Sequence, residues 1–201
     1  MKTTALLGGI MMGILSLLAG PESAVAAEVG KPAPAFALTD LSGREHSLSD
    51  YAGRIVVLEW TNPNCPVVRR VYGEGVMTAV QKQYAGKDIV WLAVNSTNKD
   101  HDDFESAESL QRAYGEWGAG FAALLLDADG TVGKSYDART TPHMFIVNAA
   151  GILVYNGAID NAPRGGKEGT VNYVKAALDD LRAGKAVGTS TTKPYGCSVK
   201  Y

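Results

Sequence analysis

Two cysteines, Cys65 and Cys197, are the residues of this chain best suited to covalent chemistry. Cys65 follows a continuous apolar run, Ile55 to Trp60, in the loop of residues 61–66. Pro66 suits the first position of a helix, because its missing N–H costs nothing there. The unpaired N–H groups and the dipole at a helix start stabilise a thiolate, so we expect the pKa of Cys65 below the free value of ~8.5. The sequence therefore predicts a nucleophilic thiol; the alternative is a buried, inert or disulfide-locked cysteine.

Cys197 stands near the end of a polar tail, residues 184–201, which is long enough to fold back over the protein. Three roles stay open for it. It is a resolving thiol that attacks a sulfenate or mixed disulfide on Cys65, the partner of a permanent structural disulfide, or an independent or intermolecular thiol.

The hydrophobic pattern predicts the elements that position these thiols. Continuous apolar runs indicate buried strands, alternating turn signals indicate a hairpin or extended arm over 30–50, and apolar residues at helical spacing indicate helices. The expected strands are 55–60, 89–94 and 121–126, with a hairpin of 144–147 and 152–155; the expected helices are 66–84, kinked at Gly73 and Gly75, then 103–117, 130–136 and 170–182. This order predicts an α/β fold with one mixed sheet and helices on both faces.

The first 26 residues read as a secretory signal peptide, with Lys2, an apolar run broken by glycines, and small residues before the cleavage site. A retained transmembrane anchor is the alternative, but the run is shorter than the ~20 residues that a spanning helix needs. We expect an exported protein, periplasmic or extracellular, without a stable membrane anchor after cleavage. Its domain covers residues 27–183 and is followed by the tail of residues 184–201.

Charge and composition argue against several functions. Nineteen Lys and Arg against 21 Asp and Glu leave a net charge of −2, so no basic surface for nucleic acid is expected. No phosphate-binding glycine loop, zinc spacing or Ser-His-Asp set is present. His143 beside Cys65 would be a copper-type pair, but with a single cysteine at the site we predict a packed or solvated histidine, no metal and no cofactor.

Several stretches together carry a family resemblance. They are Gly30-Lys31-Pro32-Ala33-Pro34-Ala35-Phe36-Ala37-Leu38, Ser47-Leu48-Ser49-Asp50-Tyr51-Ala52-Gly53, Val56-Val57-Leu58-Glu59-Trp60 leading to Cys65-Pro66, and Thr141-Pro142. The chain resembles the exported, peroxiredoxin-like (redoxin) members of the thioredoxin-like superfamily, in its alkyl hydroperoxide reductase and thiol-specific antioxidant branch. The resemblance implies a thioredoxin fold with an N-terminal hairpin extension. It also implies a cis peptide bond at Thr141-Pro142, in a loop that faces Cys65 and aligns the substrate.

The chain departs from the family patterns at defined positions. Val68 stands where a thioredoxin has its second cysteine. Asn62 and Leu58 replace the threonine or serine and the proline that precede the reactive cysteine of a peroxiredoxin, and Pro142 replaces its arginine.

These observations predict an antioxidant-type thiol oxidoreductase. In the first hypothesis Cys65 performs thiol–disulfide exchange, with Cys197 as second catalytic residue and Thr141, Pro142, Asn62 and Pro66 positioning the substrate. Its partners are a thiol or disulfide protein and an external thiol reductant. In the second, Cys65 reduces small peroxides through a sulfenic acid. In the third, a non-catalytic binding domain has kept the fold and holds a structural Cys65–Cys197 disulfide.

Overall fold

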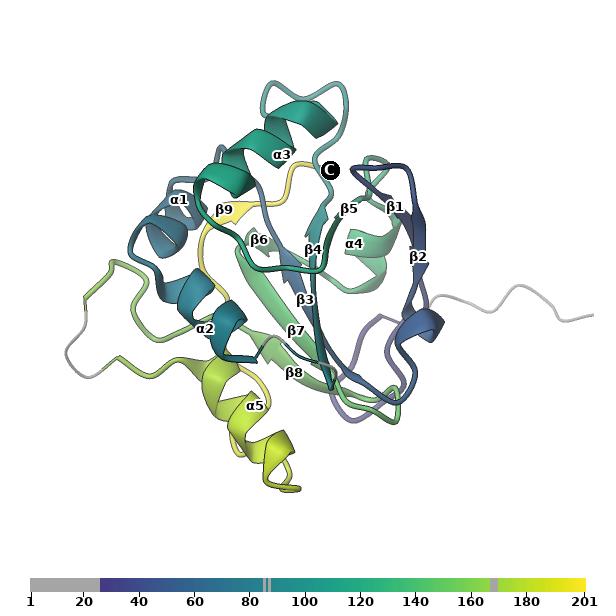
Figure 1. The fold of residues 1–201 in the computed structure, drawn as a ribbon, viewed down its shortest axis with the longest axis vertical. Helices are drawn as coiled ribbons and strands as arrows, with labels where there is room; N and C mark the ends of the chain where they lie inside the picture. Colours follow the sequence, from purple (N-terminus) through teal and green to yellow (C-terminus); the bar gives the residue numbers. More distant parts are fainter. Residues whose placement is uncertain (1–25, 85, 87, 167–169) are drawn as a thin grey trace, which may run out of the picture.

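The computed structural model describes residues 26–84, 86, 88–166 and 170–201 of the chain, and these form one α/β unit around a seven-stranded mixed sheet (Figure 1). The strand order is β2-β1-β5-β4-β3-β7-β8. Strands β3, β4 and β5 run parallel, whereas β1, β7 and β8 pair antiparallel with their neighbours. A second, two-stranded sheet joins β6 to β9 near the C-terminus. The predicted α/β class with a mixed sheet is confirmed.

The strands are β1 (Ala37–Asp40), β2 (Glu45–Ser47), β3 (Ile55–Trp60), β4 (Ile89–Asn95), β5 (Ala123–Leu126), β6 (Thr140–Thr141), β7 (His143–Val147), β8 (Leu153–Gly157) and β9 (Cys197–Ser198). The helices are the 3-10 turn η1 (Leu48–Tyr51), α1 (Pro66–Gly73), α2 (Val76–Tyr84), α3 (Ala107–Glu116), α4 (Thr131–Ser135) and α5 (Tyr173–Arg182).

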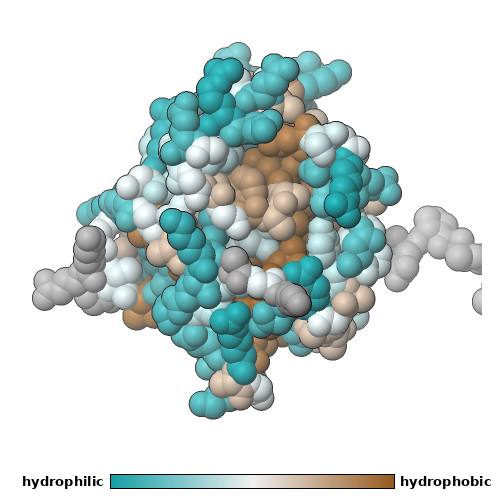
Figure 2. Space-filling model, in the orientation of Figure 1, coloured by the Kyte–Doolittle hydropathy of each residue, from teal (hydrophilic) through white to brown (hydrophobic). Residues whose placement is uncertain are grey.

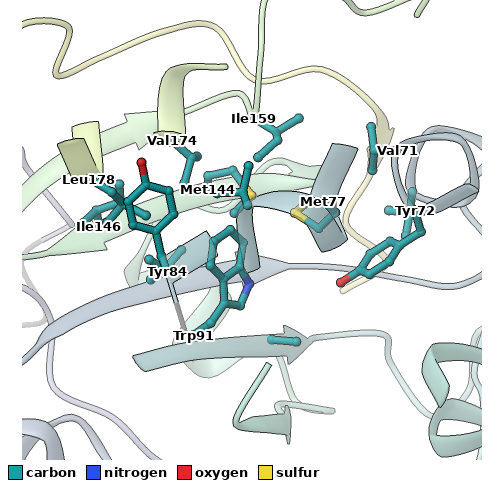
Figure 3. Packing of buried hydrophobic residues seen from close by; sticks show 14 of the residues in the cluster. Val71, Tyr72, Met77, Tyr84, Trp91, Met144, Ile146, Ile159, Val174 and Leu178 are labelled. Atoms are coloured by element: carbon teal, nitrogen blue, oxygen red, sulfur yellow. The ribbon is translucent and has the colours of Figure 1, made fainter. Parts of the chain in front are cut away.

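The alternation of side chains along β3 divides the core into two layers. Val57 faces a cluster built with α1, α2, α3 and α5, whereas Leu58 and Trp60 face a cluster built with α4 and the N-terminal segment. Figure 3 shows the first layer, where Met144 and Ile146 of β7 and Trp91 of β4 lie beneath the side chains of α2 and α5. Burial on both sides explains why the strand reads as an unbroken apolar run.

All four predicted helices have somewhat different bounds. The expected helix 130–136 is α4 (Thr131–Ser135), and the expected helix 170–182 begins only at Tyr173, after the cap Asn172; the other two differ more. The expected helix 66–84 is divided into α1 and α2, because Gly75 takes a positive φ of 74° that a continuous helix does not allow. The expected helix 103–117 begins only at Ala107, where the Ser106 hydroxyl caps the N–H of Ser109 at 3.2 Å. Acidic residues at 103 and 105 therefore lie before the helix. In Figure 2 the outer side of α3 is hydrophilic and apolar residues show in the hollow beneath it.

The N-terminal hairpin is the pair β1–β2, and it extends the main sheet because β1 also pairs with β5. The predicted signal peptide, residues 1–26, lies almost wholly outside the described residues. Within the described part of the chain, no helix is long and apolar enough to cross a membrane.

Candidate active site

Cys65 lies at the positive end of a helix. It ends the loop after β3 and is the N-cap residue of α1, with extended backbone (φ −76°, ψ 121°). Its N–H donates to the Asn62 carbonyl at 3.1 Å, and its carbonyl accepts the N–H of Arg69 at 3.0 Å. Pro66 occupies the first helical turn, as the sequence predicts. The backbone thus fixes the thiol where the helix dipole favours negative charge.

The side chain of Asn62 shapes this loop. Its Oδ1 accepts the N–H of Asn64 at 2.7 Å, and its Nδ2 donates to the Thr97 hydroxyl at 2.9 Å. Asn62 is buried, so both ends of its amide are used within the protein. Its predicted role toward a substrate stays a prediction.

The Thr141–Pro142 peptide bond is cis, as the family resemblance implies, and it lies against Cys65. Strands β3 and β7 are antiparallel, and Trp60 lies opposite His143. Thr141 and Pro142, which precede β7, therefore meet the loop that follows β3. The Sγ of Cys65 lies 3.0 Å from the carbonyl oxygen of Thr141, to which the neutral thiol donates. Sheet register therefore joins two segments that are 76 residues apart in the chain.

The C-terminal tail brings the second thiol to the same place. Strand β9 pairs antiparallel with β6, and Cys197 lies directly opposite Thr141. Only glycine fits at position 196, directly before Cys197. A Cβ there would lie 2.0 Å from the Thr141 carbonyl oxygen, and Gly196 has a φ of +142°. Cys65 and Cys197 are both free thiols, and each shifts the pKa of the other. Cys65 is only 3% exposed and Cys197 is half-buried.

The two thiols differ in acidity. Burial raises the pKa of Cys65, but hydrogen bonds from the Cys197 thiol and the Val68 N–H outweigh burial and hold the pKa below its ordinary value. Burial and the contact with Cys65 raise the pKa of Cys197 to about 11. Cys65 is therefore the more acidic thiol of the pair, the order of acidities expected of a nucleophile and its resolving partner.

The Thr141 hydroxyl adds to the asymmetry. Its oxygen is buried and has no hydrogen-bond partner beside the neutral thiol. The Thr141 side chain also lowers the pKa of Cys65, as a donor that favours the thiolate does. The Thr141 carbonyl thus accepts a hydrogen bond from the neutral thiol, and the Thr141 side chain lowers the pKa of that thiol.

Two arginines follow Cys65 on α1, and both are bound elsewhere. Arg69 donates from Nε to the Pro63 carbonyl at 2.7 Å, and Arg70 donates from Nη1 to Glu74 at 2.9 Å. Hydrogen bonds and the helix start, rather than a contacting guanidinium, account for the acidity of Cys65.

His143 is packed, which decides between the two predicted alternatives of a packed or a solvated histidine. It is 2% exposed, its Nδ1 accepts the N–H of Arg139 at 3.2 Å, and its Nε2 lies 2.8 Å from Oδ1 of Asn156. Burial lowers the pKa of His143 to about 4, so the ring is neutral. Among the described residues, no group of three His, Cys, Asp or Glu side chains could hold a metal ion.

Glu59 is a functional candidate that sequence reasoning missed. Its carboxylate lies fully buried on β3 and accepts hydrogen bonds from Trp91 Nε1 at 2.8 Å and from the Tyr72 hydroxyl at 2.9 Å, with the Gln81 amide at 3.3 Å. Burial raises the pKa of Glu59 to about 7. The available signal was a single charged residue inside an otherwise apolar strand.

The chain is similar to several known proteins. Residues 29–156 match the model of the AhpC/TSA family. The chain is 30% identical over 129 residues to a thioredoxin-like protein, YneN, of Bacillus subtilis, covering 64% of this chain and 71% of the relative. It is 30% identical over 126 residues to the thiol-disulfide oxidoreductase ResA of Geobacillus kaustophilus, covering 63% and 67%. The crystal structure of a hypothetical protein from Sinorhizobium meliloti superposes with a TM-score of 0.77 at 30% identity, covering 88% of this chain and 96% of that one.

Proposed function

The chain belongs to the AhpC/TSA family, and on that premise we propose that it is an exported thiol–disulfide oxidoreductase with Cys65 as nucleophile and Cys197 as resolving cysteine. One observation carries the proposal: Cys65, at a helix N-terminus, and Cys197, opposite the cis-proline loop, are free thiols of unequal acidity, and both meet Thr141. The similarity to relatives named thiol-disulfide oxidoreductases supports the same activity.

The reaction follows from the order of acidities. The Cys65 thiolate attacks one sulfur of a substrate disulfide, whose bond breaks to release a thiolate and leave a mixed disulfide on Cys65. Cys197 then loses its proton and attacks Cys65 Sγ, expelling the second substrate thiolate. The substrate disulfide is reduced to two thiols and the protein dithiol is oxidised to a Cys65–Cys197 disulfide. An external thiol reductant restores the dithiol.

The test is to mix the reduced protein, residues 27–201, with an excess of a disulfide and map the product by peptide mass. We expect a Cys65–Cys197 disulfide from the wild type, a mixed disulfide on Cys65 from Cys197→Ser, and no thiol product from Cys65→Ser. A Cys65→Ser variant that still reduces the disulfide would contradict the assignment. So would a wild-type Cys65 that resists every disulfide.

Peroxide reduction by the same thiol is a second candidate, favoured by family membership and by the placement of the partner cysteine in a separate segment. Here Cys65 attacks a peroxide oxygen and becomes a sulfenic acid, and Cys197 converts it to the disulfide with loss of water. The second-order rate of Cys65 oxidation by hydrogen peroxide decides this. A rate far above that of a free thiolate supports a peroxidase, and a rate no better than a free thiolate excludes it.

A further inference from the structure

The last eight residues, 194–201, form a strap across the candidate active site. Figure 1 shows the strap in yellow, with β9 between α1 and β6. Beyond the β6–β9 pair, the Val199 N–H donates to the Arg139 carbonyl at 3.1 Å, and the Lys200 carbonyl accepts the Asn98 N–H at 2.7 Å. The strap is therefore bound along its length through its backbone.

The last residue, Tyr201, anchors the strap on α4. Its ring lies over Gly130 and Gly133, where a Cβ would come within 2.4 Å and 2.5 Å of the tyrosine. Its hydroxyl donates to the Ala138 carbonyl at 2.7 Å, and Lys134 Nζ lies 5.4 Å from its ring centre. Two glycines thus form a seat that fits an aromatic side chain.

The docked strap occupies the backbone edge that a partner polypeptide would use. An extended chain bound to a strand edge pairs through its main chain, and Thr141 offers such an edge beside the Cys65 sulfur. The strap already pairs there, with its own cysteine opposite Thr141. Cys65 is 3% exposed beneath it. An incoming polypeptide and the strap therefore compete for one edge.

We propose that the strap makes the site selective by size: a polypeptide disulfide, which needs the Thr141 edge, reacts only when the strap lifts, whereas a low-molecular-weight disulfide does not need that edge. The proposal rests on the thiol–disulfide exchange proposed above. A lifted strap frees Cys65 to form the mixed disulfide, and redocking returns Cys197 to attack Cys65 Sγ. The thiol and electron balance is that of the exchange already described.

The test measures access to Cys65 apart from any disulfide activity. In a Cys197→Ser background Cys65 is the only thiol. The rate at which Cys65 is alkylated is measured with iodoacetamide and, separately, with a maleimide coupled to a folded protein. The ratio of the two rates cancels the thiolate fraction. We expect Tyr201→Ala to raise the protein-coupled rate relative to the small one by about tenfold, the effect of losing about 1.4 kcal/mol of docking free energy.

Ser198→Ala is the matched control, because Ser198 lies on β9 with an exposed side chain and the substitution keeps its backbone pairing with Thr140. We expect its rate ratio to equal that of the background. Deletion of residues 198–201 removes every anchoring contact beyond Cys197 and must raise the ratio at least as far as Tyr201→Ala. An unchanged ratio in the deletion variant overturns the proposal, whatever Tyr201→Ala does.

Rates with a low-molecular-weight disulfide and with a polypeptide disulfide, measured on the same variants, separate the two proposals. A raised alkylation ratio with no reaction toward either disulfide would retain the strap and refute the exchange activity. Equal reaction with both disulfides in every variant would retain the activity and refute selection by the strap.

Discussion

Replacing Thr141 by valine tests whether its hydroxyl tunes the nucleophile. Valine keeps the β-branched shape that suits β6 and keeps the carbonyl that lies 3.0 Å from Cys65 Sγ. It removes only the hydroxyl, which is buried and lacks a hydrogen-bond partner while the Cys65 thiol is neutral. The substitution therefore removes one donor to the thiolate and no other hydrogen bond.

The size of the effect follows from the hydrogen bond that is lost. A hydrogen bond to a charged group contributes about 1.5–3 kcal/mol, and one pKa unit corresponds to about 1.4 kcal/mol. Sulfur is a weak acceptor, so we take the low end. Thr141→Val should raise the pKa of Cys65 by about one unit. The unfolding free energy of the Thr141→Val variant should equal that of the background or be slightly higher, because an unpaired buried hydroxyl is removed.

The assay is the absorbance of the Cys65 thiolate, or the rate of its alkylation by iodoacetamide, followed against pH in the Cys197→Ser background. Thr140→Val is the matched control, because Thr140 also lies on β6 but donates its hydroxyl to the Pro142 carbonyl at 3.0 Å. We expect the control to leave the pKa of Cys65 unchanged. A folded Thr141→Val protein with the pKa of the background would refute the role of the hydroxyl.

Three further variants test other contacts. Glu59, whose pKa is raised to about 7, keeps its proton more firmly when folded, so its contribution to stability falls as pH rises from about 4.5 through 7. Glu59→Gln should remove about 2.5 kcal/mol of this fall between pH 5 and 8, measured by urea unfolding; an identical pH dependence would contradict the burial argument. Gly196→Ala should force Cys197 away from Thr141 and slow disulfide closure at least about tenfold without unfolding the domain, as oxidation kinetics and circular dichroism would show. Relative to the wild type, Cys197→Ala should raise the pKa of Cys65, because the Cys197 thiol that lowers it is gone. Alkylation of Cys65 followed against pH measures this, and a lower pKa in the variant would count against that role of Cys197.

Much of the fold is encoded in local patterns. The run Ile55–Trp60 predicts β3 with its observed bounds, because a strand buried on both faces has no polar side to interrupt it apart from Glu59. Pro66 marks the start of α1 because proline fits only the first helical turn. The start of α3 was wrong by four residues, since acidic residues favour a helix start as readily just before the cap as after it.

The sequence by itself determined that a cysteine stands at a helix N-terminus, and the family resemblance supplied the cis-proline loop. Tertiary structure decided what surrounds that cysteine. Cys197 lies 132 residues further along, and only the pairing of β9 with β6 brings it to Cys65. The partners of Glu59 come from three other elements. Such contacts depend on sheet register and chain return, which local propensity does not encode. The second thiol beside Cys65 and the strap above it therefore became visible only in the folded protein.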